Sequence, residues 1–351
     1  MRSTMASSYV SRTPLVSILV PAYNAARYLP ELCQSIQAQT CPHYEVIIGN
    51  DGSKDNPAAV LAPFLRDSRF RLLEWQPNRG LNAAWAMLLS AMRGEYWCSP
   101  GADDLLYPSF LEKRMESLEA NPQAFLVHGP PEYIDESGVP AEPSWPRLNL
   151  PLQLQPRRSL EVLLQHNVIN QPSALVRTDI TKQVLPFFHW NWAYAPDWFI
   201  WILHAATNGD LLWDPQVRIK YRIHSNSLSF TPEKDHLRRA ERQLVPLVAL
   251  STAAEFSQWA AECWTRWGRI LYRRWLRQAL VLKLRGGLQS HWVQLGAHAY
   301  YRGKGRRVCL WVELARHFAG LAASDITHRR ALKRQRFPVS GLAQIDDPIF
   351  R

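Results

Sequence analysis

The chain has 351 residues, 47% of them hydrophobic, which provides for a sizeable core and excludes an intrinsically disordered protein. No apolar run approaches the ~18 residues that a membrane-spanning helix needs. The formal charge of +11 comes from the C-terminal part, because residues 231–351 hold 22 Lys and Arg against 9 Asp and Glu.

Strand and helix patterns alternate at about 25-residue spacing along the first hundred residues. Buried strands are predicted at 14–23, 44–53, 69–75 and 95–99, where β-branched and apolar residues run together. Helices are predicted at 26–40, 56–67 and 81–94, with Asn56 as N-cap, Pro57 in the first turn and Gly94 as the stop. This alternation predicts an α/β fold with a mainly parallel sheet flanked by helices.

The rest of the chain is less regular. Residues 121–160 are rich in proline and predict a hairpin followed by an excursion that could serve as a lid or acceptor loop. An aromatic segment then leads into an amphipathic helix predicted at about 196–207. From about residue 231 onward, the pattern predicts a basic α-helical extension containing Trp, Leu and Arg.

The cysteine pattern and the start of the chain bear on the compartment. Five cysteines, at 33, 41, 98, 263 and 309, form no CxxC pair, which is typical of reduced, packed thiols. The first apolar run, LVSILV, is too short for a signal peptide and no small-residue cleavage site follows it. We therefore expect a cytoplasmic protein.

Polar segments follow three of the predicted strands: PAYN, GNDGSKD and SPGADD. In parallel sheets ligands bind beyond the carboxyl ends of the strands, so these segments predict a ligand-binding rim. Asp103 and Asp104 lie between apolar stretches, and burial of a bare carboxylate is costly. From position alone they either face a cation or begin the next helix, where acids favour the helix dipole.

Six segments resemble, in order, the motifs of the family-2 inverting glycosyltransferases of the GT-A fold. They are VSILVPAYN, YEVIIGNDGSKD, NRGLNAA, GEYWCSPGADD, APDWFIWI and YRIHSNSLS, and they span about residues 14–229. The resemblance implies a GT-A catalytic domain over 14–230, between a flexible N-terminus (1–13) and a basic helical C-terminal region (231–351). It also implies sugar transfer from a nucleotide-diphospho-sugar, expected to be UDP-linked, to a hydroxyl of a cell-surface glycan or lipid-linked acceptor.

The metal motif of the family implies that Asp103 holds a divalent cation, Mn²⁺ or Mg²⁺, with Asp104 and His224 as further ligands. Such a cation offsets the charge that develops on a leaving diphosphate, and hard oxygen ligands suit both ions. Gly101 stands where the family commonly has the first acid of the motif.

Nucleotide contacts are implied for Pro21, Tyr23, Asp51, Arg79 and Asp103. Asp51 would accept a hydrogen bond from the imide N–H of a pyrimidine, although an Asp-Gly pair is also a common turn signal. Arg79 is equally consistent with a solvated loop charge.

Asp197 matches the acid that serves as catalytic base in the family. Inversion needs one base for the acceptor hydroxyl and not the carboxylate pair of a hydrolase. Pro196 replaces the Glu that usually precedes this acid, and the local pattern also fits a structural acid in a first helical turn. The resemblance also implies that Arg222 and Ser227 lie near the diphosphate or acceptor, and we expect Trp192 to stack on a sugar.

The basic C-terminal region allows two interpretations. Trp267, Leu271 and Trp275 lie near one face of a predicted helix at 263–287, flanked by arginines. The region is either a helical bundle docked on the catalytic domain, or it binds an anionic membrane surface on the cytosolic side. No nucleic-acid-binding motif is present, so nucleic acid is not an expected partner.

Two rival functions remain open. A catalytically degenerate scaffold that binds nucleotide-sugar at the membrane surface would explain the departures at Gly101 and Pro196. A nucleotidyltransferase is disfavoured, because PAYNAARYLP has no glycine that would let the backbone wrap a triphosphate.

Overall fold

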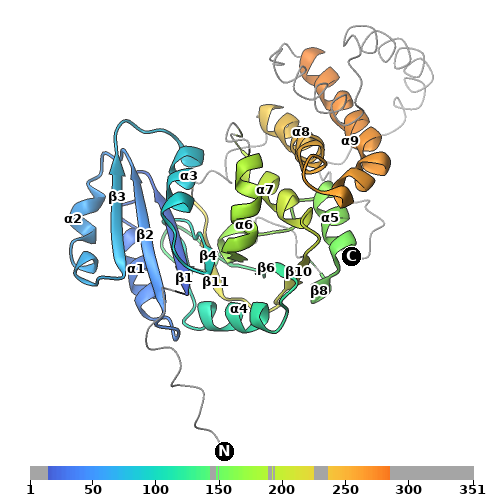
Figure 1. The fold of residues 1–351 in the computed structure, drawn as a ribbon. Helices are drawn as coiled ribbons and strands as arrows, with labels where there is room; N and C mark the ends of the chain where they lie inside the picture. Colours follow the sequence, from blue (N-terminus) through green and yellow to red (C-terminus); the bar gives the residue numbers. More distant parts are fainter. Residues whose placement is uncertain are drawn as a thin grey trace, which may run out of the picture.

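The computed structural model describes residues 15–142, 148, 150–188, 192, 194–224 and 236–284, without the side chains of 236–240 and 278–284. The predicted flexible N-terminus, Ser227, Cys309 and the remainder of the C-terminal region lie outside the described residues. Over the described part the chain forms two sheets with helices on both faces of the larger one (Figure 1).

The large sheet contains the four strands predicted in the first hundred residues. These are β1 (Val16–Ala22), β2 (Tyr44–Asp51), β3 (Phe70–Trp75) and β4 (Tyr96–Cys98), and they run parallel. The full order is β3-β2-β1-β4-β9-β6-β10-β8. Here β6 (Ala124–His128) and β10 (Asp210–Trp213) are parallel, whereas β9 (Leu175–Arg177) and β8 (Gln153–Leu154) run antiparallel to their neighbours. The predicted mainly parallel sheet is confirmed.

A second, three-stranded sheet of order β5-β11-β7 lies against the rim of the first. Its centre is β11 (Ile219–Arg222), which pairs antiparallel with β5 (Leu105–Leu106) and parallel with β7 (Glu132–Ile134). Because β5 follows directly after Asp104, this pairing brings the adjacent aspartates next to residues 222–224, more than a hundred positions later in the chain.

Helices cover the two faces of the large sheet with separate hydrophobic cores. One face carries α1 (Leu29–Gln37), α2 (Pro57–Leu61) and α4 (Phe110–Glu119). The other carries α3 (Leu81–Ala91), α5 (Pro156–Gln165), α6 (Thr178–Val184) and α7 (Pro196–Ala205). Strand alternation produces this division, because Ile18 and Val20 face the first core while Leu19 between them faces the second. Short 3₁₀ turns lie at Phe64–Arg66, Gln171–Ser173 and Leu185–Phe187.

Several helix predictions needed correction. The helix predicted at 56–67 ends at Leu61 and continues as a 3₁₀ turn, because Pro63 has no N–H to extend it. Asn56 occupies the N-cap position with φ 55° but its side chain makes no capping hydrogen bond. Gly94 does not end α3, which stops at Ala91. It permits close packing, since a Cβ there would lie 2.6 Å from the backbone N of Ser17.

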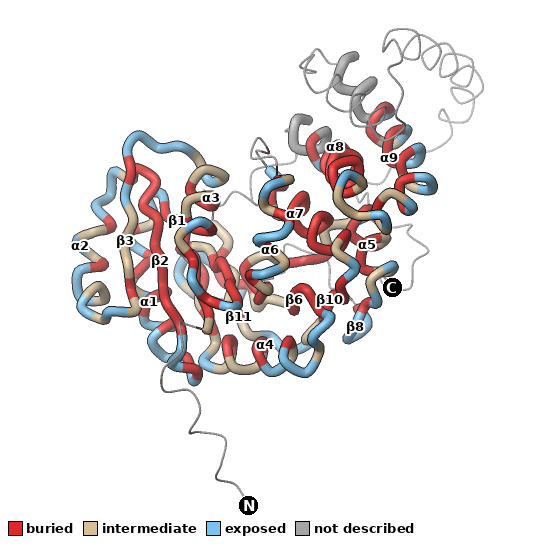
Figure 2. Tube along the Cα trace, viewed as in Figure 1, coloured by how far each residue is buried: buried red, intermediate tan, exposed pale blue. Residues whose placement is uncertain are grey.

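The helix predicted as amphipathic is α7, and that prediction was wrong. Every residue of α7 is buried except Asp197, which is partly exposed (Figure 2). The reason is that α7 packs between α5, α6 and α8 (His236–Ala253), so no apolar face is left for solvent.

The described C-terminal part is helical, as predicted. The helices α8 and α9 (Gln258–Leu284) pair with each other, and their apolar residues share one core with α5 and α7. Leu271 and Trp275 of α9 are buried, and Trp267 packs against the same core. None of the described helices has an apolar stretch long enough to cross a bilayer.

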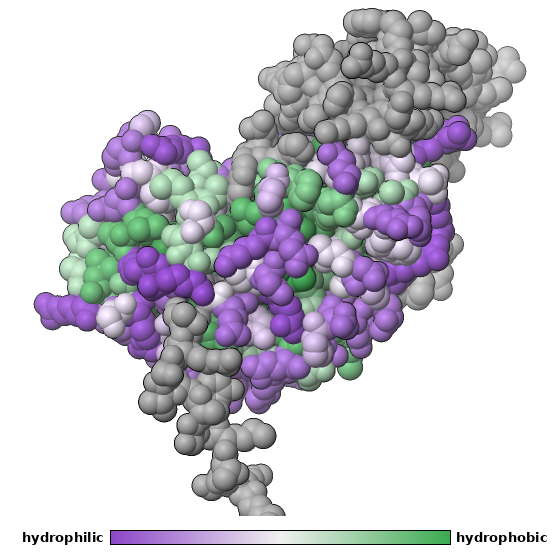
Figure 3. Space-filling view, in the orientation of Figure 1, coloured by the Kyte–Doolittle hydropathy of each residue, from purple (hydrophilic) through white to green (hydrophobic). Residues whose placement is uncertain are grey.

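In the view of Figure 3, hydrophilic side chains predominate at the lower edge around α4.

The four described cysteines are buried and free, as predicted for packed thiols. They lie in the hydrophobic cores: Cys33, Cys41 and Cys98 on one face of the sheet, and Cys263 on the other.

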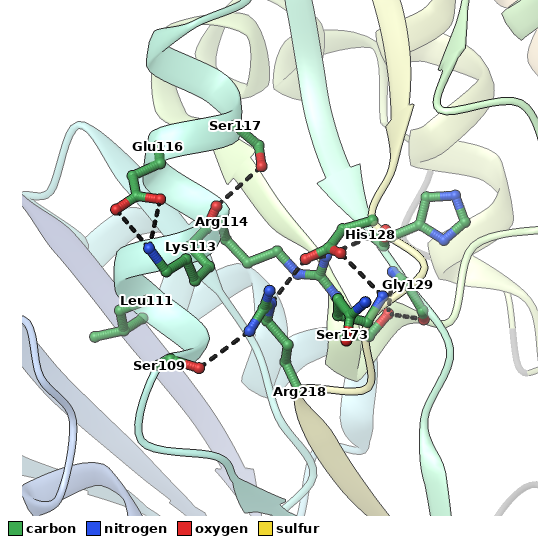
Figure 4. Close-up of polar contacts among 12 residues, drawn as sticks. Ser109, Leu111, Lys113, Arg114, Glu116, Ser117, His128, Gly129, Ser173 and Arg218 are labelled. Atoms are coloured by element: carbon green, nitrogen blue, oxygen red, sulfur yellow. Dashed lines mark hydrogen bonds and ion pairs between the residues drawn. The ribbon is translucent and has the colours of Figure 1, made fainter.

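A buried ionic cluster joins α4 to the segment between β10 and β11 (Figure 4). The Arg114 guanidinium, wholly buried, contacts Asp214 Oδ2 at 2.9 Å, and Arg218 Nε reaches the same oxygen at 2.7 Å. His128, at the end of β6, is also wholly buried, with its ring against Trp213. Burial, assisted by the charge of Arg114, lowers the pKa of His128 to about 3, so this imidazole is neutral in the folded protein.

Candidate active site

The three polar segments predicted to form a ligand rim do meet at one edge of the sheet. Since β1, β2 and β4 are parallel, the residues that follow Ala22, Asp51 and Cys98 emerge at the same side. Tyr23 is 49% exposed there, whereas Pro21 is paired opposite Gly49 within the sheet. Pro21 is nevertheless the partly exposed residue of β1, so both predicted nucleotide contacts reach the surface, Tyr23 more than Pro21.

Asp51 organises the turn that follows β3. It is 3% exposed, and its carboxylate accepts hydrogen bonds from Trp75 Nε1 (2.5 Å), Arg79 N (2.7 Å) and Gly80 N (2.8 Å). These contacts agree with the alternative interpretation of the Asp-Gly pair, in which Asp51 stabilises a turn. They also place the exposed residue Arg79 at the rim. Recognition of the nucleobase by Asp51 stays a prediction. The carboxylate keeps free acceptor capacity for such a hydrogen bond.

Asp103 and His224 form a pair at the rim. His224 Nε2 lies 2.9 Å from Asp103 Oδ2, and the two side chains are 11% and 25% exposed. The imidazole stacks on the ring of Tyr28, with centroids 5.4 Å apart. A carboxylate and an imidazole 121 residues apart in the chain are therefore held together, partly open to solvent.

Asp104 makes contacts of a different kind. It is 1% exposed, with Oδ1 accepting from Arg222 N (3.1 Å) and Oδ2 from Gly101 N (2.8 Å). Burial and the neighbouring charge of Asp103 raise the pKa of Asp104 well above its usual value. These contacts favour a structural role that joins the 101–104 turn to β11. A contribution of Asp104 to metal binding stays a prediction.

Gly101, the departure from the family motif, has a steric explanation. A Cβ at this position would lie 2.6 Å from Asp103 Oδ1 and 2.8 Å from Asp104 Oδ2, closer than side-chain atoms pack. A first acid here would therefore require the two carboxylates to shift, so their present conformation depends on this glycine.

Arg222 is 2% exposed and fixes several segments around the pair. Its Nε donates to Asp103 O (2.8 Å), Nη1 to Asp135 O and Glu136 O (3.3 and 3.0 Å), and Nη2 to Glu31 Oε2 (2.7 Å). Most of its donors are thus engaged within the protein. The geometry favours a positioning role, and direct contact of Arg222 with a diphosphate stays a prediction.

The donor chemistry at the rim fits a hard divalent cation. Asp103 supplies a partly exposed carboxylate oxygen and His224 an imidazole nitrogen, and open coordination positions would remain for phosphate oxygens. No group of three or more His, Cys, Asp or Glu side chains converges within the described residues. The predicted ion would therefore be held by few protein ligands.

Asp197 lies in the first turn of α7, immediately after Pro196. Its Oδ2 accepts a hydrogen bond from Asn167 Nδ2 at 3.0 Å, and the Oδ1 of Asn167 is buried without a partner among the described residues. Burial raises the pKa of Asp197, and the hydrogen bond from Asn167 opposes that rise. A carboxylate with a raised pKa is a stronger base, which suits the predicted role.

Trp192 is less accessible than a sugar-stacking platform requires. It is 5% exposed and its ring packs on Phe199, with centroids 5.2 Å apart. Its backbone oxygen accepts a hydrogen bond from the side chain of Asn82. Stacking of a sugar on Trp192 stays a prediction.

Sequence reasoning missed three residues that shape the site: Tyr28, Glu31 and Asn167. Tyr28 stacks on His224 and lies 5.0 Å below the Arg222 guanidinium, and Glu31 binds that same guanidinium. Tyr28, Leu32 and Ile36 recur near helical spacing in the sequence, which indicates a helix face and gives no sign of a site role. Asn167 lies in a polar segment, HNVIN, whose amides were the available signal.

Comparison with known proteins shows which family this sequence resembles. The profile of glycosyl transferase family 2 matches residues 17–185. A protein of Haemophilus influenzae described as an uncharacterized glycosyltransferase is 29% identical over 224 residues, covering 62% of this chain and 68% of the relative. A Rickettsia typhi protein with a similar description is 28% identical over 218 residues, covering 60% of this chain and 65% of the relative.

The fold also resembles that of solved structures. Staphylococcus aureus TarS, residues 1–349, superimposes with a TM-score of 0.55 at 16% identity, covering 82% of this chain and 80% of TarS. The matched profile, the relatives and the fold therefore agree with the sequence resemblance: residues 17–185 match glycosyl transferase family 2, and the described residues have a GT-A fold.

Proposed function

We propose that this protein is an inverting glycosyltransferase that moves a sugar from a UDP-linked donor to a hydroxyl of a glycan or lipid-linked acceptor. The match to family 2 supports transfer from a nucleotide-sugar. TarS, which shares the fold, has been solved in complex with UDP and with UDP-GlcNAc, and this supports a uridine nucleotide here.

The observation that carries the proposal is the Asp103–His224 pair on the rim of the parallel sheet. These side chains would hold a Mn²⁺ or Mg²⁺ ion, which supplies Lewis-acid stabilisation of the charge on the departing diphosphate. Arg222 and Tyr28 keep the pair in place from beneath, through Asp103 O and the face of the imidazole. Exposed Tyr23 and Arg79 flank the same rim and would contact the nucleoside.

Asp197 would remove the proton from the acceptor hydroxyl as the sugar is transferred. In-line displacement with inversion needs a single base. Asn167 orients the carboxylate through Oδ2, and the raised pKa of Asp197 increases its basicity. The acceptor hydroxyl would attack the anomeric carbon from the side opposite the diphosphate, so one new glycosidic bond forms as the bond to the diphosphate breaks.

A thermal-shift experiment tests the donor site. UDP with Mn²⁺ should raise the melting temperature of the wild type, because a ligand that binds only the folded state stabilises it. Asp103→Ala should abolish that metal-dependent increase, while Asp179→Ala, at an exposed acid in the first turn of α6, serves as the matched control. If no nucleoside diphosphate stabilises the wild type with any metal, the donor assignment is wrong.

Product analysis separates the enzyme from a degenerate scaffold. Transfer from UDP-sugars to glycan or lipid-linked acceptors, with NMR assignment of the anomeric configuration, should show an inverted linkage. If UDP and donor bind with normal affinity but no acceptor is ever glycosylated, the protein is a nucleotide-sugar-binding scaffold.

We further propose that the outer face of α9 contacts an anionic membrane surface on the cytosolic side, near a lipid-linked acceptor. The aromatic face of α9 is used for packing, which leaves Ile270, 50% exposed, among basic side chains. The exposed arginines follow helical spacing: Arg266, Arg269, Arg273 and Arg277. Co-sedimentation with phosphatidylglycerol vesicles but not phosphatidylcholine vesicles should be lost in Arg269→Gln/Arg273→Gln. Equal binding to both vesicle types would contradict the proposal.

A further inference from the structure

The segment that leads into α7 is held by a residue from the C-terminal helices. Glu241, on α8, is 1% exposed, and its Oε1 accepts hydrogen bonds from the backbone N–H groups of Tyr194 (2.6 Å) and Ala195 (2.8 Å). The two donors and the acceptor are 46–47 residues apart in the chain. Both contacts lie immediately before Pro196 and Asp197.

The beginning of α7 lacks the usual local means of fixing itself. Ala195 occupies the N-cap position and has no side-chain oxygen, and the structure shows no side-chain capping hydrogen bond there. A buried carboxylate that accepts two backbone N–H groups makes charge-assisted hydrogen bonds, which are stronger than neutral ones. A negative charge at a helix N-terminus is also favourable. Glu241 therefore does from a distance what an N-cap side chain would do locally.

Asp197 is therefore held in position by two separate sets of hydrogen bonds. Its side chain is oriented by Asn167, on the segment between α5 and β9, and its backbone by Glu241 through residues 194 and 195. The next residue of α8, Arg242, favours the ionised form of Asp197 electrostatically, against the burial that raises its pKa. Two neighbouring residues of α8 thus act on the same candidate base.

We infer that Glu241 is a positioning residue for the candidate base Asp197, so that α8, beyond the segment that matches the family profile, completes the active site. The inference depends on the proposed role of Asp197. The packing supports it, because α8 contacts α7 along much of its length and both helices share one core. The described C-terminal helices would then be part of the catalytic unit as well as a docking element.

The test compares Glu241→Ala with Glu241→Gln, and uses Glu262→Ala on α9 as a matched control. Loss of the acceptor in Glu241→Ala should lower kcat at least 10-fold, while KM for the donor and the UDP-induced thermal shift stay within about twofold. Glu241→Gln keeps an oxygen acceptor and should recover most of kcat. A purely structural role would instead reduce donor binding and kcat together, or leave kcat unchanged, and either result would overturn the inference.

Hydrogen exchange gives a readout that does not need turnover. The peptide containing Tyr194 and Ala195 should exchange faster in Glu241→Ala, with β1 and β2 unchanged. Unchanged exchange at this peptide would contradict the inference even if the protein proves to be inactive. If Asp197→Asn retains full activity, the proposed base has failed and the inference fails with it, and faster exchange in Glu241→Ala would then show only that Glu241 fixes the start of α7.

Discussion

The buried imidazole of His128 makes the stability of the protein depend on pH below neutrality. In the folded state its pKa is lowered to about 3 from a usual value of 6.5, because it is wholly buried and lies near Arg114. Its two ring nitrogens have no hydrogen-bond partner among the described residues, so nothing in the described fold favours protonation. The unfolded chain, however, takes up a proton as the pH falls through 6.5.

The sign and size of the effect follow from linkage. Above pH 6.5 the imidazole of His128 is neutral in both the folded and the unfolded state, so it does not change the free energy of unfolding. As the pH falls toward 3 only the unfolded state is protonated, so stability is progressively lost. The pKa values of 6.5 and about 3 predict a loss of about 2 kcal/mol between pH 7.5 and pH 5. For a chain of this size that is roughly 3 °C in melting temperature.

The substitution His128→Phe isolates this contribution, because phenylalanine keeps a ring against Trp213 but cannot titrate. The wild type should lose about 2 kcal/mol relative to the variant between pH 7.5 and pH 5. His204, also buried with its pKa lowered to about 4, is common to both proteins and cancels. Urea unfolding followed by tryptophan fluorescence gives the difference, and His43→Phe, at an exposed imidazole, is the control. If the two stability curves stay parallel from pH 7.5 to pH 5, the reasoning about His128 is refuted.

Three further predictions concern the site and the opposite edge of the sheet. Gly101→Ala should lower the apparent affinity for UDP about 10-fold in the presence of Mn²⁺, because the added Cβ would lie 2.6 Å from Asp103 Oδ1. A UDP titration followed by thermal shift measures this affinity, and an unchanged titration would contradict the prediction. Asp197→Asn should lower kcat by roughly 10²–10⁴ without loss of donor binding, and wild-type kcat should rise with pH through the raised pKa of Asp197, since the base must be ionised. A pH-independent wild-type kcat, or a variant that keeps its activity, would count against that role. Glu45→Gln should lower the free energy of unfolding in urea by about 1–3 kcal/mol, because this 3%-exposed carboxylate accepts hydrogen bonds from Arg71 and Arg93. Since Glu45 lies at the edge of the sheet opposite the site, kcat at low temperature should not change. A change in kcat with no loss of stability would contradict this prediction.

The sequence predicted the first four strands of the large sheet because each is a local pattern. β1, β2, β3 and β4 are short runs of β-branched and apolar residues ended by turn residues, and such runs form strands wherever a core covers them. The same local logic failed at helix ends. Gly94 looked like a stop, but the chain leaves the helix at Met92 because it must turn to enter β4 close to Ser17.

The prediction of which helix faces are exposed was wrong where the packing partners of a helix are distant in the sequence. The α7 segment was expected to have a polar face, yet α8 covers it, and only Asp197 remains partly exposed. For α9 the sequence left two interpretations of the tryptophan face, and the structure shows Leu271 and Trp275 packed inside the protein. Which face of a helix is covered depends on elements that a local window does not contain.

The sequence by itself predicted the fold class and the resemblance to glycosyltransferase family 2, because six motifs in order specify a chain topology, and it nominated the residues of the candidate site. The tertiary structure decided what those residues contact. It paired Asp103 with His224, buried Asp104 and Arg222 in structural contacts, and placed Glu241 behind the start of α7. The Asp103–His224 contact joins residues 121 positions apart, and Glu241 joins α8 to residues 46–47 positions earlier. Their hydrogen bonds form only once the two sheets and the C-terminal helices pack together, so no local pattern could have revealed them.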